Sequence, residues 1–265
     1  MFRQTISTLA LVLAAAPCLA QAPARPHDPE RAFDAFVFRM LQNMQVKDAP
    51  AVAPLVNALL SDTSAHMRAA PRRNATAADS ARARTIVRTL RDELAPFGDV
   101  AAAERAGYQR FMPWLDDQAV FHYNNLSNAA AAADSFHAAR PSSLLYRNDG
   151  GGRLVLVGVM YTAPSSATLD ELDARLPLGI AHWHQHVDFC GPGPLSPEAR
   201  QVPDSASLAK WLAIDTREAC TAAGGLFVPR LFGWMAHVYA FDGDSDEQIW
   251  GGHGRDPMRM HKHDR

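Results

Sequence analysis

The segment SLLYRNDGGGRLVLVGVMY, residues 143–161, decides the fold of this chain. Two runs with strand character, 143–147 and 153–161, flank the turn sequence Asn148–Gly152, and this arrangement is a strong hairpin pattern. The run from Leu154 to Met160 is apolar at both alternating sets of positions. We therefore expect a central strand of an antiparallel sheet, covered on both faces.

Helical patterns precede this hairpin. Apolar residues recur at steps of three and four from Glu30 and again over 86–94, which predicts amphipathic helices. Further strands are expected over 119–123, over the histidine-rich stretch 181–190, and over 231–241 after a break at Gly224-Gly225. Helices followed by hairpin-linked strands predict an α+β fold, with an antiparallel sheet core and N-terminal helices packed against it.

The ends of the chain predict export. A positive start, an apolar run from Leu9 to Ala16 and small residues before Gln21 are typical of a secretory signal peptide, 1–20, although a buried N-terminal helix is the alternative. The run is too short to span a bilayer, so no stable membrane anchor is expected. We assign 21–75 to a helical extension and linker, 76–250 to an α+β metal-binding domain and 251–265 to a flexible tail.

Net charge and cysteine content narrow the function classes. The formal net charge is −2 and no basic block is present, so nucleic acid is not an expected partner. Cleavage of the signal peptide would remove Cys18 and leave Cys190 and Cys220, an even pair that predicts a disulfide in an exported protein. The alternative is that Cys190 is a thiolate ligand, as in blue-copper sites.

The stretch AHWHQHVDFC, residues 181–190, carries the strongest chemical signal. On a strand, His182, His184 and His186 would share one face with Asp188, because alternate side chains point the same way. Asp188 is either a partner that fixes the tautomer of an imidazole ligand or a solvated turn carboxylate.

Two further histidines, His122 and His237, lie on other predicted strands. Imidazoles from neighbouring strands are a standard way to hold zinc or copper. A single ion rarely uses three alternate residues of one strand, so we place His182 at the periphery. The predicted ligands are His184, His186 and His237, with His122 as fourth ligand or proton relay.

The C-terminal segment favours copper over zinc as the metal. It interleaves the residues His253, Met258, Met260, His261 and His263. Thioethers select Cu(I), and imidazoles accept either oxidation state of copper. A disordered polar tail with no metal role is the alternative interpretation.

Several short motifs, spread over 82–250, define a resemblance. They are Gly107-Tyr108 with Phe111 and Pro113, Pro141-x-Ser143-Leu144-Leu145-Tyr146-Arg147, Leu156–Pro164, Leu172-Asp173-x-Arg175-x-Pro177-Leu178, Trp183-His184-x-His186 with Cys190, and Gly233-Trp234-Met235-x-His237-Val238-Tyr239. Together they resemble a family of exported bacterial and fungal proteins of uncharacterised activity. The resemblance implies that the chain groups with these proteins, and it implies no mechanism. His182, the N-terminal helices and the Met/His tail depart from its usual pattern.

These features predict an exported protein, periplasmic or secreted, that binds a transition metal for sequestration or delivery. The rival hypothesis is a metalloenzyme with an open three-histidine zinc or copper centre that performs hydrolytic, hydration or oxidative chemistry. A third hypothesis is an exported structural or interaction domain with incidental histidines. Serine-hydrolase, His-Glu-x-x-His and phosphate-loop motifs are absent from the sequence.

Overall fold

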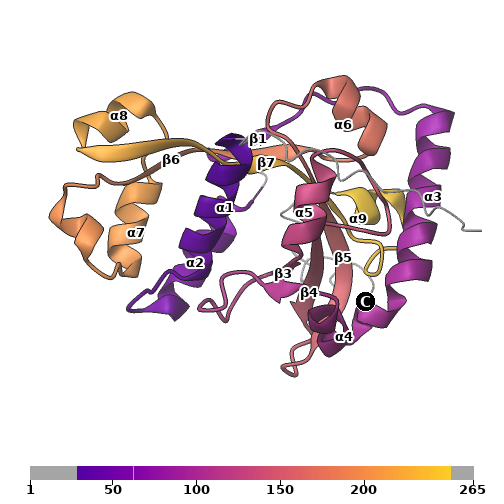
Figure 1. Ribbon diagram of the computed structural model, residues 1–265, viewed down its shortest axis with the longest axis horizontal. Coiled ribbons are helices and arrows are strands. Elements are labelled where there is room, and N and C mark those ends of the chain that lie inside the picture. Colours follow the sequence, from indigo (N-terminus) through magenta and orange to yellow (C-terminus); the bar gives the residue numbers. More distant parts are fainter. Residues whose placement is uncertain (1–28, 62, 252–265) are drawn as a thin grey trace, which may run out of the picture.

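A computed structural model of the chain describes residues 29–61 and 63–251, which form one antiparallel sheet flanked by helices (Figure 1). The strands pair in the order β1-β6-β7-β5-β4-β3-β2. Their bounds are Met67–Ala69 (β1), Gln109–Arg110 (β2), Phe121–Asn124 (β3), Ser143–Asn148 (β4), Leu154–Ala163 (β5), His184–Pro192 (β6) and Gly225–Val238 (β7). The predicted α+β class is confirmed. The predicted signal peptide, and the predicted tail from residue 252 on, lie outside the described residues.

The β4–β5 hairpin forms where the sequence predicts it. The side-chain oxygen of Asn148 accepts hydrogen bonds from the backbone N–H groups of Gly150 at 2.9 Å and Gly152 at 3.0 Å. Both glycines have positive φ, 86° and 89°, a conformation that a side chain would disfavour. Strand β5 pairs with β4 on one side and β7 on the other, so it is a central strand.

The main core lies on one face of the sheet, beneath helices. These are α3 (Ala77–Leu94), α4 (Val100–Arg105), α6 (Leu169–Arg175) and α9 (Asp246–Trp250); α5 (Leu126–Ala132) also contacts β5, and η1 (Ala95–Gly98) extends α3. Helix α3 begins at a capping box in which the Thr76 hydroxyl accepts from Asp79 N and Asp79 accepts from Thr76 N. Its buried stripe of Ile86, Leu90 and Leu94 packs into this core.

Strands β6 and β7 extend beyond the rest of the sheet as a long two-stranded arm. The arm carries η2 (Pro197–Arg200), α7 (Ser205–Leu212) and α8 (Arg217–Ala222), and Figure 1 places α7 and α8 at the opposite end of the molecule from α3. A disulfide joins Cys190 of β6 to Cys220 of α8, with the two Cα atoms 5.7 Å apart. The predicted disulfide is confirmed, and it removes Cys190 from the set of possible metal ligands.

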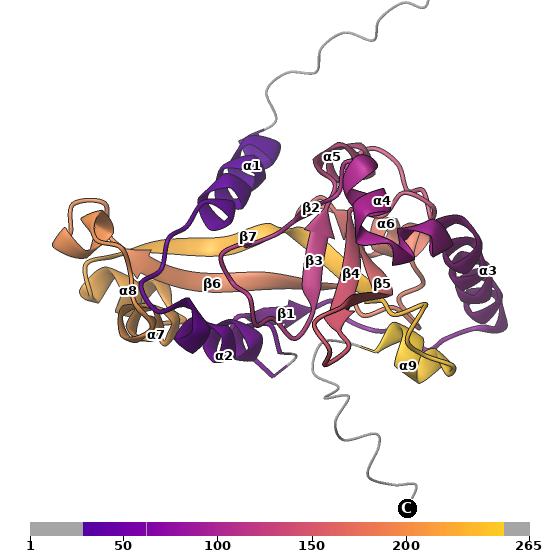
Figure 2. The same cartoon turned by 90° about the horizontal axis from the view of Figure 1, so that it is seen from below.

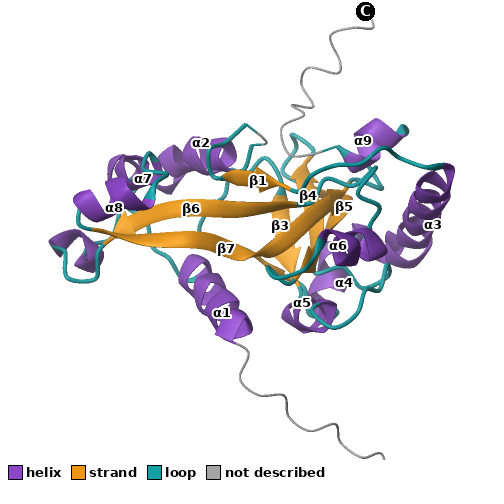
Figure 3. Ribbon diagram, turned by 90° about the horizontal axis from the view of Figure 1, so that it is seen from above, coloured by secondary structure: helices purple, strands orange, loops and turns teal. Residues whose placement is uncertain are grey.

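The N-terminal helices pack against the sheet and its arm, as predicted. Helix α1 (Pro29–Gln42) lies beside β7, whereas α2 (Ala49–Leu59) lies on the β6 side with α7 (Figures 2 and 3). The Arg230 guanidinium of β7 donates to Asp34 of α1 at 3.0 Å. The Trp114 indole donates to Leu41 O at 2.8 Å, which ties the end of α1 to the loop before β3.

The structure differs from the sequence predictions at three places. Strand β1 lies in the predicted extension and linker, yet it pairs with β6. Strand β7 runs over 225–238 rather than 231–241, because pairing with β6 already begins at Gly225, which lies opposite Pro192. A Cβ at Gly225 would lie 2.6 Å from the sulfur of Cys190, so only glycine fits there. Strand β6 begins only at His184, so His182 does not share its face. No helix among residues 29–61 and 63–251 is both long and apolar enough to span a bilayer.

Candidate metal centre

Four histidines from three strands converge on one point of the sheet. His122 of β3 and His237 of β7 have their Nε2 atoms 3.2 Å apart. The ring centroids of His184 and His237 are 5.2 Å apart, and those of His184 and His186 are 5.4 Å apart. His184, His186 and His237 are only 4%, 7% and 3% exposed. The structure thus brings together all four residues predicted as ligands.

Strand register explains why these residues meet. His122 lies opposite Leu145 of β4, and Leu145 lies opposite Gly158 of β5. Strands β4 and β5 lie between β3 and β7, so β3 and β7 are three strand spacings apart, about 14 Å at 4.8 Å per spacing. The imidazoles of His122 and His237 reach toward each other across this gap, where the glycine between them has no side chain.

A bulge in β7 lies opposite the β6 histidines. His184 pairs with Met235 and His186 pairs with Leu231, so two residue steps of β6 oppose four of β7. Within the bulge, Phe232 has a φ of 62°, which is uncommon for a residue with a side chain. Bulges of this kind re-aim side chains and occur often beside functional sites.

Replacement of Gly158 of β5 should disturb the cluster through β7. A methyl group there would lie 2.4 Å from Val238 O and 2.8 Å from Tyr239 Cα. Because these are backbone atoms, β5 and β7 would have to separate, and His237 would move with β7. We expect Gly158→Ala to lower the free energy of unfolding by about 1–3 kcal/mol. Gly98→Ala is the control, since no atom lies within 4 Å of its new methyl group. Equal denaturant midpoints for the two variants would contradict this account.

Burial keeps three of the four clustered imidazoles neutral. It lowers the pKa of His122 and of His184 to about 4 and the pKa of His186 to about 3, and the neighbouring His184 lowers the last further. At neutral pH these rings therefore carry no charge. A neutral imidazole is the form that binds a metal ion, so no proton has to be removed first.

The cluster is not arranged as a preformed ion cage. No group of three or more His, Cys, Asp or Glu side chains in the described part of the chain has metal-site geometry. The rings of His184 and His237 are stacked at 15°, an orientation in which their nitrogens do not aim at one point. Two nitrogens on a tetrahedral ion with bonds of about 2.1 Å lie about 3.4 Å apart. The Nε2 atoms of His122 and His237, 3.2 Å apart, are already near that separation, whereas the stacked ring of His184 is not oriented toward the same point.

The other predicted site residues lie around this cluster. His182 precedes β6 and contributes its backbone oxygen, which lies 3.3 Å from His184 Nδ1. Asp188 is half-buried with a left-handed backbone, φ 62°, and its role beside an imidazole stays a prediction.

Sequence reasoning missed one buried histidine, His66. Its ring stacks on Phe189 with centroids 4.6 Å apart, and its nitrogens lie 3.1 Å from Val187 O and 2.8 Å from Leu212 O. His66 therefore ties β6 to the end of α7. A lone histidine before a three-residue strand gives no periodic pattern from which this contact can be predicted.

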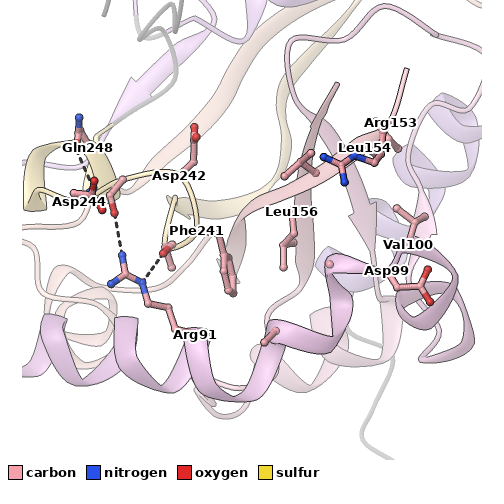
Figure 4. Close-up of a pocket in the computed structure, with 15 residues that line it drawn as sticks. Arg91, Asp99, Val100, Arg153, Leu154, Leu156, Phe241, Asp242, Asp244 and Gln248 are labelled. Carbon is pink, nitrogen blue, oxygen red and sulfur yellow. Dashed lines mark hydrogen bonds between the residues drawn. The ribbon is translucent and has the colours of Figure 1, made fainter. Parts of the chain in front are cut away.

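A surface groove of about 1070 Å³ lies elsewhere, between the end of α3, the start of β5 and the segment 240–248. Figure 4 shows the Arg91 guanidinium at its wall, where it donates to Ala240 O at 2.7 Å and Gly243 O at 2.9 Å. Arg153, also on the wall, pairs with Asp149 at 3.0 Å. These cations already have partners in the protein, and the groove has none of the histidines.

Comparisons with known proteins return no relative. No protein-family model matches the chain, and searches of curated proteins and of solved structures each give no significant match. The resemblance described from the motifs therefore stays a prediction, and function has to be inferred from the histidine cluster itself.

Proposed function

We propose that this is an exported protein that binds one transition-metal ion through His122, His184, His186 and His237, for sequestration or delivery. The convergence of four buried or half-buried imidazoles from three strands is the observation that carries the proposal. Four nitrogen donors would close the coordination of a tetrahedral ion. That number favours holding an ion over catalysis, since catalytic centres keep an open position.

Copper is the metal we propose, with zinc as the alternative. Imidazole accepts both metals, but the affinity order for divalent ions places copper above zinc, and the Met/His-rich sequence of 253–263 adds thioethers that suit Cu(I). Export to the periplasm or beyond is supported by the sequence of residues 1–20 and by the disulfide, which persists in oxidising compartments. The metal ion is the only partner that these features support.

Metal titration of the purified, untagged apo-protein tests the proposal. We expect one equivalent of Cu(II) or Zn(II) to bind, and we expect His184→Ala/His186→Ala to weaken binding by more than about 100-fold. Even groups that only support metal ligands are worth about 10–100-fold in affinity. His137→Ala is the matched control, because His137 is exposed and contacts Ser135 rather than the cluster.

Circular dichroism establishes that each variant is folded before titration. Electron paramagnetic resonance of the Cu(II)-loaded wild type gives a second readout, because nitrogen ligands split the copper signal. Equal affinity in the double variant and the wild type, or no nitrogen coupling, would refute the proposed site.

A further inference from the structure

Methionines lie directly opposite three of the four clustered histidines. Met235 of β7 pairs with His184, Met160 of β5 pairs with His237, and Met67 of β1 pairs with His186. Residues directly opposite in an antiparallel sheet share a face, with Cβ atoms about 4.5–5.5 Å apart. The histidine face of the sheet is therefore also a methionine face.

Two of these methionines are buried in a small cluster of their own. Met160 is 8% exposed and Met235 is 4% exposed, and both belong to an apolar cluster with Leu145 and Val157, separate from the main core. Methionine is a common filler of irregular core gaps, so burial alone assigns no role. What points to a role is the strand register, which places Met160 opposite His237 and Met235 opposite His184.

The residues directly opposite the four histidines in the adjacent strands carry no charge. The residues directly opposite the four histidines are Met67, Ala69, Leu145, Met160, Leu231 and Met235. A buried charge is costly unless it is compensated, and the solvation cost of an ion rises with the square of its charge. A site built from neutral imidazoles and thioethers therefore favours a monovalent ion over a divalent one.

We infer that the centre is built for Cu(I), which is held by the thioethers of Met160 and Met235 together with the imidazoles directly opposite them, His237 and His184, rather than by all four imidazoles. This inference rests on the proposed function and specifies the class of ion. Thioether sulfur is a soft donor that selects Cu(I), whereas Zn(II) is satisfied by imidazole nitrogen. The methionines should therefore raise the affinity for Cu(I) and leave the affinity for divalent ions unchanged.

Substitution of the methionines by leucine separates the two ion classes. Met160→Leu/Met235→Leu keeps the side-chain volume and removes both sulfurs, a change the core tolerates well. We expect its affinity for Cu(I), measured by competition with a Cu(I) chelator under anaerobic conditions, and for Ag(I) to fall at least tenfold. Affinity for Zn(II) should stay within twofold of the wild type. Met112→Leu, a buried methionine of a different cluster, is the control and should bind all three ions like the wild type.

X-ray absorption at the copper edge of the Cu(I)-loaded protein gives a second readout. Cys190 and Cys220 are joined in the disulfide, so sulfur in the first coordination shell would come from methionine, and its loss in Met160→Leu/Met235→Leu would assign it to these two residues rather than to Met258 or Met260. Sulfur scattering, together with a loss of affinity in the double variant that is specific to Cu(I) and Ag(I), supports the inference. Unchanged Cu(I) affinity in the double variant, or a shell without sulfur, overturns it while leaving the histidine site intact. Failure of the wild type to bind any of these ions would instead refute the proposed function.

Discussion

Lowering the pH from 7 to 5 should cost the metal-free protein several kcal/mol of folding free energy. The pKa of an imidazole is near 6.5 in the unfolded chain, but in the folded protein it is about 4 for His122 and His184 and about 3 for His186. Between these values the unfolded state binds more protons than the folded state. Stability is therefore complete above pH 6.5 and is lost as the pH falls toward 4.

The size of the effect follows from linkage. One unit of pKa difference corresponds to about 1.4 kcal/mol, so a histidine whose pKa falls from 6.5 to about 4 contributes on the order of 3 kcal/mol across the whole window. Burial is the largest cause for all three histidines, because desolvation disfavours the charged ring. The interval from pH 7 to 5 samples only part of this loss, but it lies above the range in which most carboxylates titrate.

Urea unfolding at several pH values, with a chelator present, measures this loss. Replacement of one buried ring by His186→Gln should flatten the dependence of the unfolding free energy on pH between 7 and 5. His137→Gln, which changes an exposed histidine, should retain the wild-type profile. A wild-type free energy that is constant across this interval would show that the cluster is not desolvated as described.

Much of the architecture follows from local patterns in the sequence. The Asn148–Gly152 turn requires positive φ at two glycines, and the apolar run of β5 requires cover on both faces, so hairpin and central strand are both predictable. Helix α3 is predictable from its apolar stripe. The start of β7 is not predictable, because the Gly224-Gly225 pair is typical of a chain break. Only the structure shows that Gly225 is needed to pack against the disulfide.

The members of the histidine cluster are predictable from the sequence, but the geometry of the cluster is not. Alternation in the 181–190 stretch identifies His184 and His186, and histidines on separate predicted strands identify His122 and His237. Strand order, the β7 bulge and the gap above Gly158 determine how the rings meet, and these are long-range properties. His182 is not a strand residue, because residues 178–181 form a turn and a bend and β6 begins only at His184.

Removal of the disulfide should destabilise the protein by roughly 3–4 kcal/mol without loss of the metal site. Cys190 and Cys220 are 30 positions apart, and the chain-entropy estimate for a loop of that length gives this value. The affected region is the arm, where both cysteines pack with Trp211 and Phe227. Cys190→Ala/Cys220→Ala should lower the midpoint of chemical unfolding, and wild-type protein treated with a reductant should match it.

Metal affinity in the same variant separates this role from the earlier alternative of a thiolate ligand. Cys190 lies four residues beyond His186 on β6, about 13 Å along the strand at 3.3 Å per residue. A metal ligand cannot act over that distance. The double alanine variant should therefore bind one metal ion with an affinity within about threefold of the wild type, when both are measured under conditions in which the variant is folded. A large loss of affinity with folding intact would contradict the four-histidine ligand set as described.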